Sequence, residues 1–178
     1  MIRLARHGQT AYNAAGRFQG HLPVPLDETG CAQAHALAQA CVGQGFTTLV
    51  CSPLRRARET ADIVAERIGL EPVQDERWVE TDAGDWTDRT FAEIVAEDPE
   101  AFAAFARVDP AFAFPGGESF AAHQARVAEA AADLRACVDG APTLVVCHGV
   151  TMRLALVAVR GDEGARTMEL PNAALVDL

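Results

Sequence analysis

The sequence predicts an α/β fold, a three-layer α/β/α sandwich around a mixed, mostly parallel central sheet. Three short apolar runs with β-branched residues, at 2–5, 47–51 and 143–147, are typical of strands buried on both faces. Helical patterns separate these runs, and parallel neighbouring strands require such crossover connections. Because no linker, charge block or internal repeat divides the 178 residues, we expect a single domain over 1–178.

The clearest helix covers 53–68, where apolar residues recur at helical spacing. We expect Ser52 as its N-cap, Pro53 in its first turn and Gly69 as its C-cap. Further helices are expected at 29–44, 90–107, 119–138 and 150–160. Two weaker strand candidates lie at 71–76 and 173–178.

The segment 78–118 does not follow this alternation. It contains both tryptophans and five of the eight phenylalanines. We expect it to form a cap over the carboxyl edge of the sheet, where ligands of open α/β sheets bind. The phenylalanines of 91–120 have two interpretations: an apolar rim for bulky or aromatic leaving groups, or ordinary core.

The chain is acidic, with 25 acidic against 15 basic residues and a net charge of −10. This charge disfavours nucleic acids and anionic membranes as partners. All the basic residues are arginines, and several follow the expected strands. A basic pocket within an acidic surface favours small anions, so we expect a small-molecule partner and a monomer or homodimer.

No apolar stretch is long enough to span a bilayer, and Arg3, Arg6 and His7 interrupt any secretory signal pattern. The five cysteines include no C-x-x-C pair and lie mostly in apolar segments, so we expect them to be reduced core residues. Both features predict a cytoplasmic protein. Because no H-x-x-x-H, D-x-D or cysteine cluster is present, we expect no metal and no cofactor.

Two histidines, His7 and His148, directly follow two of the expected strands. Side chains beyond the carboxyl ends of parallel strands converge, so these rings are expected to meet. Arg6 precedes the first histidine, and Gly149 follows the second at an expected helix start, where free backbone N–H groups bind anions. A guanidinium matches phosphate oxygens and a neutral imidazole can attack phosphorus, so the pattern predicts phosphate chemistry.

Three arginines in the first turns of the helix at 53–68 indicate a bound anion, because the positive end of the helix dipole disfavours cations there. Arg55 can pair with Glu59, and Arg58 with Asp62, at i,i+4 spacing. This leaves Arg56 as the arginine most available to a ligand.

The residues occur in blocks whose order resembles the histidine phosphatase superfamily, in its short phosphoglycerate-mutase-like type. The blocks are Arg6-His7-Gly8-Gln9-Thr10 with Asn13, continued by Gly16-Arg17-Phe18-Gln19-Gly20; Ser52-Pro53-Leu54-Arg55-Arg56-Ala57; Glu80 before Gly84 and Trp86; Pro115-Gly116-Gly117-Glu118-Ser119; and His148-Gly149. One such triplet is weak evidence, whereas five blocks in order are specific.

This resemblance implies a phosphoglycerate-mutase-like fold and metal-independent hydrolysis of a small phosphomonoester. In the family pattern His7 becomes phosphorylated and Glu80 is the proton donor, with Asp82 as a rival. The residues expected around the phosphoryl group are Arg6, Asn13, Gln19, Gly20, Arg56, His148 and Gly149.

Two other functions remain open. The first is phosphoglycerate mutase chemistry, for which the chain looks too short, and the second is a non-catalytic module that binds phosphorylated ligands. The sequence departs from the family pattern at Tyr12, Pro23, Val24 and 86–88. These departures lie around the reacting core, so they leave the substrate unassigned.

Overall fold

The computed structural model of the chain describes residues 1–137 and 141–178. Its sheet has five strands in the order β3-β2-β4-β1-β5. The strands are β1 (Ile2–Arg6), β2 (Thr48–Cys51), β3 (Pro72–Gln74), β4 (Thr143–Cys147) and β5 (Leu175–Asp177). β5 is antiparallel to β1 and the other pairs are parallel, so the expected mixed sheet is confirmed. Both weaker strand candidates are its edge strands.

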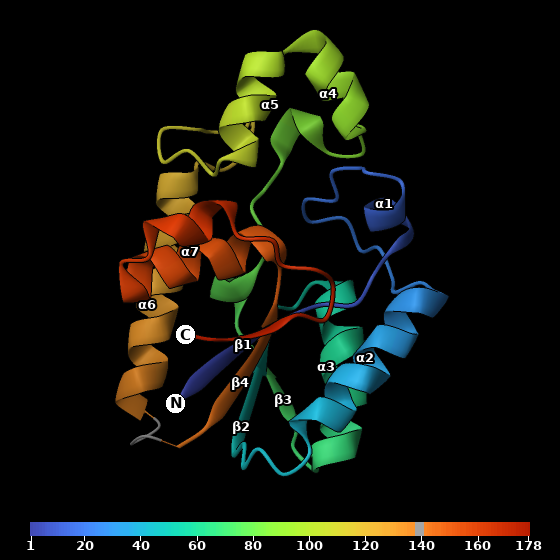
Figure 1. Ribbon diagram of the computed structural model, residues 1–178, viewed down its shortest axis with the longest axis vertical. Coiled ribbons are helices and arrows are strands. Elements are labelled where there is room, and N and C mark those ends of the chain that lie inside the picture. Colours follow the sequence, from blue (N-terminus) through green and yellow to red (C-terminus); the bar gives the residue numbers. More distant parts are fainter. Residues whose placement is uncertain (138–140) are drawn as a thin grey trace.

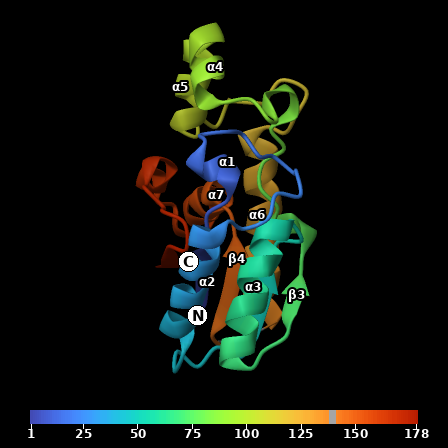
Figure 2. The same ribbon diagram turned by 90° about the vertical axis from the view of Figure 1, so that its right-hand side faces the viewer.

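Helices cover both faces of this sheet. The longest helices of the described residues are α2 (Glu28–Cys41), α3 (Arg55–Ile68), α6 (Phe120–Cys137) and α7 (Gly149–Arg160). Helices α2 and α3 lie on one side of the sheet, and α6 and α7 on the other (Figure 1, Figure 2). Residues of β4 alternate between these faces: Leu144 and Val146 pack with α2 and α3, while Val145 and Cys147 pack with α6 and α7. The expected three-layer sandwich is therefore confirmed. Val138, the last residue of the expected helix at 119–138, lies outside the described residues.

Helix α3 begins later than the sequence predicts. Its N-cap is Leu54, which makes no side-chain cap hydrogen bond. The hydroxyl of Ser52 is instead bonded to His148, with 2.8 Å between Ser52 Oγ and His148 Nε2. The prediction of Ser52 as N-cap and Pro53 in the first turn is therefore wrong. Gly69 is the C-cap in the left-handed conformation, as expected.

Short helices fill the chain between β3 and α6 and lie beyond the carboxyl ends of the strands (Figure 1). They are η1 (Glu76–Trp78), η2 (Gly84–Trp86), α4 (Phe91–Glu97) and α5 (Pro99–Ala106). The helix expected over 90–107 is interrupted at Asp98, whose side chain caps α5 by accepting from Ala101 N. Pro99 has no backbone N–H to continue α4, so it starts a new helix.

Aromatic side chains hold this segment together. Phe18, from the loop after β1, packs 5.1 Å from Trp86 and 5.0 Å from Phe105, measured between ring centroids. Trp86 lies 5.3 Å from Phe114, edge to face. Because Phe18 and Phe114 are nearly buried, the cluster fixes the segment 78–118 to the loop that follows the first strand.

The chain after α7 returns to the end of β1. It passes through η3 (Glu163–Thr167) before β5. Arg6 N donates to Ala174 O, and Ala173 N donates to Arg6 O. The Asn172 side chain donates to the carbonyl of His7 over 3.0 Å. Residues 172–174 therefore support the strand end that carries the first histidine.

Cys41, Cys51 and Cys147 are buried and unpaired, but Cys31 is exposed, so its expected core position is wrong. The side chain of Cys137 lies outside the described residues. Burial raises the pKa of the Cys51 thiol to about 11. Of the helices that the structure describes, none has the length and apolar character needed to cross a membrane.

Candidate active site

The pairing of β1 with β4 brings the two histidines together. Arg6 lies opposite Cys147 in the parallel register, so His7 and His148 leave adjacent strands at the same edge. Their ring centroids are 5.1 Å apart, and the two side chains are 2% and 0% exposed. His7 and His148 therefore lie side by side at one edge of the sheet, as expected.

His7 is held as a neutral ring with its Nε2 atom toward an arginine. Its Nδ1 atom lies 2.6 Å from the carbonyl of Gly8, which can only accept, so Nδ1 carries the proton. Arg56 Nε donates to His7 Nε2 over 3.3 Å. Burial, then the charges of Arg56 and Arg6, hold the pKa of His7 well below its usual value. His7 Nε2 therefore carries no proton at neutral pH, and its lone pair accepts the hydrogen bond from Arg56.

Arg56 is buried on the second residue of α3. Its Nη2 atom donates to the carbonyl of Gly20 over 3.0 Å, and its Nη1 atom to that of Leu22 over 3.3 Å. Burial lowers its pKa to about 10, and Glu80 opposes that effect. The guanidinium therefore stays charged at neutral pH and lies against the imidazole. The expected Arg55–Glu59 pair is present at 2.7 Å.

Arg6 is the second cation beside His7. Its Nη1 atom donates to the carbonyl of Leu170, while its Nε atom is buried without a partner among the described residues. A Cβ atom on Gly149 would lie 3.5 Å from the guanidinium carbon, an ordinary van der Waals contact, so Gly149 and Arg6 are direct neighbours. Burial lowers the pKa of Arg6, and the charge of Glu80 raises it. A buried cation with a free donor is suited to an anion.

Asn13 and Gln19 present amide NH₂ groups to the same space. Asn13 Oδ1 accepts from Thr10 N over 3.1 Å and from Asn172 Nδ2 over 3.3 Å. Gln19 Oε1 accepts from Thr10 Oγ1 over 2.9 Å. Because both amide oxygens are occupied, the nitrogens are left to face the cavity. Gly20, with a φ of +47°, positions Arg56 through its carbonyl.

His148 lies behind the cavity wall. Ser52 Oγ accepts from Leu54 N over 3.3 Å and is hydrogen-bonded to His148 Nε2 over 2.8 Å; when the hydroxyl donates its own proton to Nε2, the ring proton lies on Nδ1. That Nδ1 atom is buried and has no partner among the described residues. Burial and the charge of Arg56 hold the pKa of His148 well below its usual value. The ring is therefore neutral at pH 7, and its Nδ1 atom makes no hydrogen bond within the described part of the chain.

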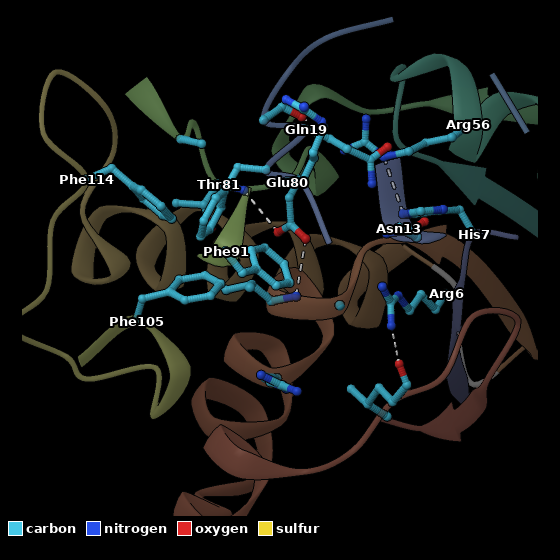
Figure 3. A pocket seen from close by; sticks show the side chains of 18 of the residues that line it. Arg6, His7, Asn13, Gln19, Arg56, Glu80, Thr81, Phe91, Phe105 and Phe114 are labelled. Atoms are coloured by element: carbon cyan, nitrogen blue, oxygen red, sulfur yellow. Dashed lines mark hydrogen bonds between the residues drawn. The ribbon is translucent and has the colours of Figure 1, made fainter. Parts of the chain in front are cut away.

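Glu80 is the carboxylate of the cavity. Oε1 accepts from Thr81 N over 3.0 Å and from Thr151 Oγ1 over 3.3 Å, and Oε2 accepts from Val150 N over 3.3 Å. Its rival Asp82 binds Gly84 N over 3.0 Å and is not among the residues that line the cavity. Figure 3 shows Glu80 between the side of the cavity formed by His7, Arg6 and Arg56 and the side formed by aromatic rings.

The cavity has a volume of about 340 Å³ and two contrasting walls. One wall carries the charged and amide groups described above. The other carries Phe91, Phe105 and Phe114. Phe114 belongs to the core and Phe105 packs against it, whereas the preference for bulky or aromatic leaving groups stays a prediction. The residues of the cavity that were not predicted are Arg17, Phe18, Thr81, Ala83, Ala106, Val150, Arg153 and Leu170.

Of the predicted phosphate-binding residues, six line this cavity: Arg6, Asn13, Gln19, Gly20, Arg56 and Gly149. His7 and Glu80 line it as well, and His148 lies directly behind His7. The described residues contain no group of three or more His, Cys, Asp or Glu side chains arranged to hold a metal ion. The fold and this site define a class of α/β protein in which a neutral histidine lies in an arginine-lined pocket suited to an anion.

Comparison with known proteins shows the family to which the chain belongs. The family model described as histidine phosphatase superfamily (branch 1) matches residues 2–178, so the chain belongs to that superfamily and the resemblance is confirmed. The chain is 32% identical over 179 residues to "Probable phosphoglycerate mutase GpmB" of Yersinia pestis (strain Pestoides F), covering 98% of this chain and 82% of the relative.

Two solved structures share the fold at similar identity. A mycobacterial glucosyl-3-phosphoglycerate phosphatase complexed with VO3 is 35% identical, with a TM-score of 0.91 over 98% of this chain and 90% of the other. YhfR of Bacillus stearothermophilus is 30% identical, with a TM-score of 0.89 over 99% and 90%. These names place the chain among phosphatases and mutases without specifying a substrate.

Proposed function

We propose that the chain is a phosphatase that hydrolyses a small phosphomonoester through a phosphohistidine on His7, without a metal or cofactor. The observation that carries this proposal is the state of His7, a buried neutral imidazole whose Nε2 lone pair lies against Arg56. A vanadate complex of the mycobacterial relative supports it, because vanadium in such oxyanions adopts geometries similar to phosphorus in phosphoryl transfer.

In the first step His7 Nε2 attacks phosphorus, and the bond from phosphorus to the leaving oxygen breaks. The leaving oxygen takes a proton from Glu80, the carboxyl group of the cavity. Gly8 O holds the Nδ1 proton, so the ring becomes a phosphoimidazolium without exchanging its other proton. In the second step water attacks phosphorus, its proton returns to Glu80, and the nitrogen–phosphorus bond breaks.

The charge of the phosphoryl oxygens is met by donors that are already in place. Arg6 Nε is a buried donor without a partner in the described part of the chain, and the amide groups of Asn13 and Gln19 line the same cavity. His148 Nδ1 also lacks a partner among the described residues, but His148 lies behind His7 and does not line the cavity. Arg56 adds a charge beside the attacking nitrogen. Preorganised donors of this kind stabilise the transition state, and removal of one typically lowers kcat by about 10²–10³.

A phosphomonoester screen with a chelator present tests this proposal. We expect release of inorganic phosphate, and an acid-labile, alkali-stable phosphoryl group on the protein after a rapid quench with ³²P-labelled substrate. His7→Asn should abolish both, while the exposed histidine variant His35→Asn should retain them. Hydrolysis by His7→Asn at the wild-type rate would contradict the phosphohistidine.

Mutase activity is the second candidate, favoured by the name of the Yersinia relative. It uses the same phosphohistidine but returns the phosphoryl group to the other oxygen of a phosphoglycerate. Interconversion of 2- and 3-phosphoglycerate faster than phosphate release would support it over hydrolysis. A protein that binds vanadate but forms no phosphohistidine would support the non-catalytic module.

A further inference from the structure

We infer that Arg153 is a specificity residue of the cavity and that it binds a carboxylate on the leaving group of the substrate. The inference rests on the proposed function, because it assigns the class of phosphomonoester that the site accepts. A substrate would then carry two anionic groups, a phosphate at His7 and a carboxylate at Arg153.

Arg153 occupies the fifth position of α7 and lines the same cavity as His7 and Glu80. Its Nε atom donates to the carbonyl of Met168 over 2.9 Å, which fixes the plane of the guanidinium. Within the described part of the chain, neither Nη atom has a hydrogen-bond acceptor or an ion-pair partner, and neither is fully buried. The two Nη atoms of Arg153 are therefore available to a ligand.

Each of the other three arginines of the cavity has a partner for at least one of its terminal nitrogens. Arg56 is anchored by two carbonyls and contacts His7, and Arg6 is anchored by Leu170 O. Arg17 forms an ion pair with Asp88 at the rim. Arg153 therefore differs from its neighbours because both terminal nitrogens lack a partner among the residues that the structure describes.

The guanidinium of Arg153 lies close to the reacting groups. Its charge lowers the pKa of Arg6, and the charge of Glu80 raises the pKa of both arginines. Burial lowers the pKa of Arg153, because the cation loses part of its hydration in the folded protein. Glu169, which is exposed, also raises that pKa but lies beyond ion-pair distance. A ligand anion would offset the cost more directly than this surface carboxylate.

A carboxylate fits this position better than a second phosphate. The two terminal nitrogens of a guanidinium match the two oxygens of a carboxylate in a bidentate pair. The phosphoryl dianion is balanced by Arg6 and Arg56, which leaves one positive charge on Arg153 for one negative charge. A second phosphate dianion would add an unbalanced charge beside Glu80.

Matched substrates test the inference. 3-Phosphoglycerate and glycerol 3-phosphate differ by a carboxylate in place of a hydroxymethyl group, and phenyl phosphate reports hydrolysis without either group. We expect Arg153→Met to lower kcat/KM for 3-phosphoglycerate by about 10- to 100-fold, mainly through KM, as for a lost hydrogen bond to a charged group. Activity on glycerol 3-phosphate should change less than about threefold. Arg160→Met, an exposed arginine on the same helix, is the control.

The outcomes separate this inference from the proposed function. An equal loss on both substrates would show that Arg153 serves the phosphoryl group and would overturn the inference. Wild-type preference for glycerol 3-phosphate would overturn it as well, while hydrolysis of phenyl phosphate would leave the proposed function standing. Failure to hydrolyse any of the three esters, with no phosphohistidine formed, would overturn both.

Discussion

His7 derives its reactivity from its surroundings. An imidazole in water titrates near 6.5 and is partly protonated at neutral pH. Here burial is the largest influence and the neighbouring charges of Arg56 and Arg6 act in the same direction, so the pKa falls well below that value. The two arginines that we propose for phosphoryl binding therefore also keep His7 Nε2 unprotonated.

Arg56→Gln should raise the pKa of His7, because it removes a cation that disfavours the imidazolium. The measurement is an NMR titration of His7 with ¹³C-labelled histidine. Arg55→Gln, on the same turn of α3 but exposed and paired with Glu59, should leave the titration unchanged. An unchanged His7 pKa in Arg56→Gln would mean that the charge of Arg56 does not contribute to lowering it.

At the level of elements, α6 fixes the segment that carries Glu80. Arg126 Nη1 donates to Arg77 O over 2.7 Å and to Val79 O over 2.8 Å, and Nη2 donates to Glu80 O over 3.3 Å. The same guanidinium pairs with Glu118 at 2.8 Å, and both side chains are 19% exposed. The Arg126 side chain thus connects α6 to residues 77–80, which lead into the cavity, and to Glu118 in the turn before α6.

Arg126→Gln should lower the free energy of unfolding by about 1–3 kcal/mol, because three carbonyls and Glu118 lose a mostly buried partner. Urea denaturation measures the loss. Arg135→Gln, on the exposed face of the same helix, should change stability by less than about 0.5 kcal/mol. Equal effects of the two substitutions would show that the Arg126 contacts add nothing specific.

A close crossing of two loops depends on Gly84. Its φ is +49°, and a Cβ atom there would lie 2.2 Å from Pro115 O and 2.5 Å from Gly117 N. Both neighbours are backbone atoms, so they cannot move aside cheaply. The crossing holds the segment after Glu80 against the turn that precedes α6.

Gly84→Ala should therefore destabilise the protein by more than Gly43→Ala does. Gly43 also has a positive φ, +74°, but a Cβ atom at that position would meet nothing within 4 Å. Gly43→Ala should cost about 1 kcal/mol for the backbone conformation alone, and Gly84→Ala should cost about 2 kcal/mol more for the clash. Equal melting temperatures for the two variants would contradict the close crossing.

For the whole molecule, three buried histidines link stability to pH. His7, His123 and His148 have pKa values well below the usual 6.5, with burial as the main cause. The unfolded chain takes up protons near pH 6.5 and the folded chain does not. The stabilisation is therefore complete above pH 6.5 and is lost as the pH falls toward the folded pKa values.

We expect the free energy of unfolding to fall between pH 7 and pH 5, by up to about 1.4 kcal/mol per pH unit for each of these histidines. Denaturant unfolding at several pH values measures the slope. His123→Asn should reduce the slope, whereas His35→Asn, at an exposed position, should not. A slope unaffected by His123→Asn would mean that other groups carry the pH dependence.

The sequence predicted the elements whose signals are local or periodic. The apolar runs of β1 and β4 and the residues after them placed His7 beside His148, because parallel strands end at the same edge. That residues 78–118 form a cap over the active-site edge within a single domain stays a prediction, although three phenylalanines of this segment, Phe91, Phe105 and Phe114, line the cavity.

What the sequence could not show depends on contacts between distant segments. Ser52 has the residue type and position of a helix cap, but its hydroxyl serves His148 from another strand. Arg153 follows the His148-Gly149 block by four residues, yet only the structure shows that it lines the same cavity as Arg6 and Glu80 and that its terminal nitrogens have no partner among the described residues. Likewise, Thr10 orients the amide of Gln19, a contact that spacing alone does not indicate.

The return of residues 170–174 to the end of β1 has a consequence for biosynthesis. Leu170 O anchors Arg6 and Asn172 anchors the carbonyl of His7, although these partners are separated by more than 160 positions. During translation residue 7 therefore leaves the ribosome tunnel long before residues 170–174 can support it. Translation products that stop before residue 170 should lack the anchors of Arg6 and His7, even where the first four strands have already formed.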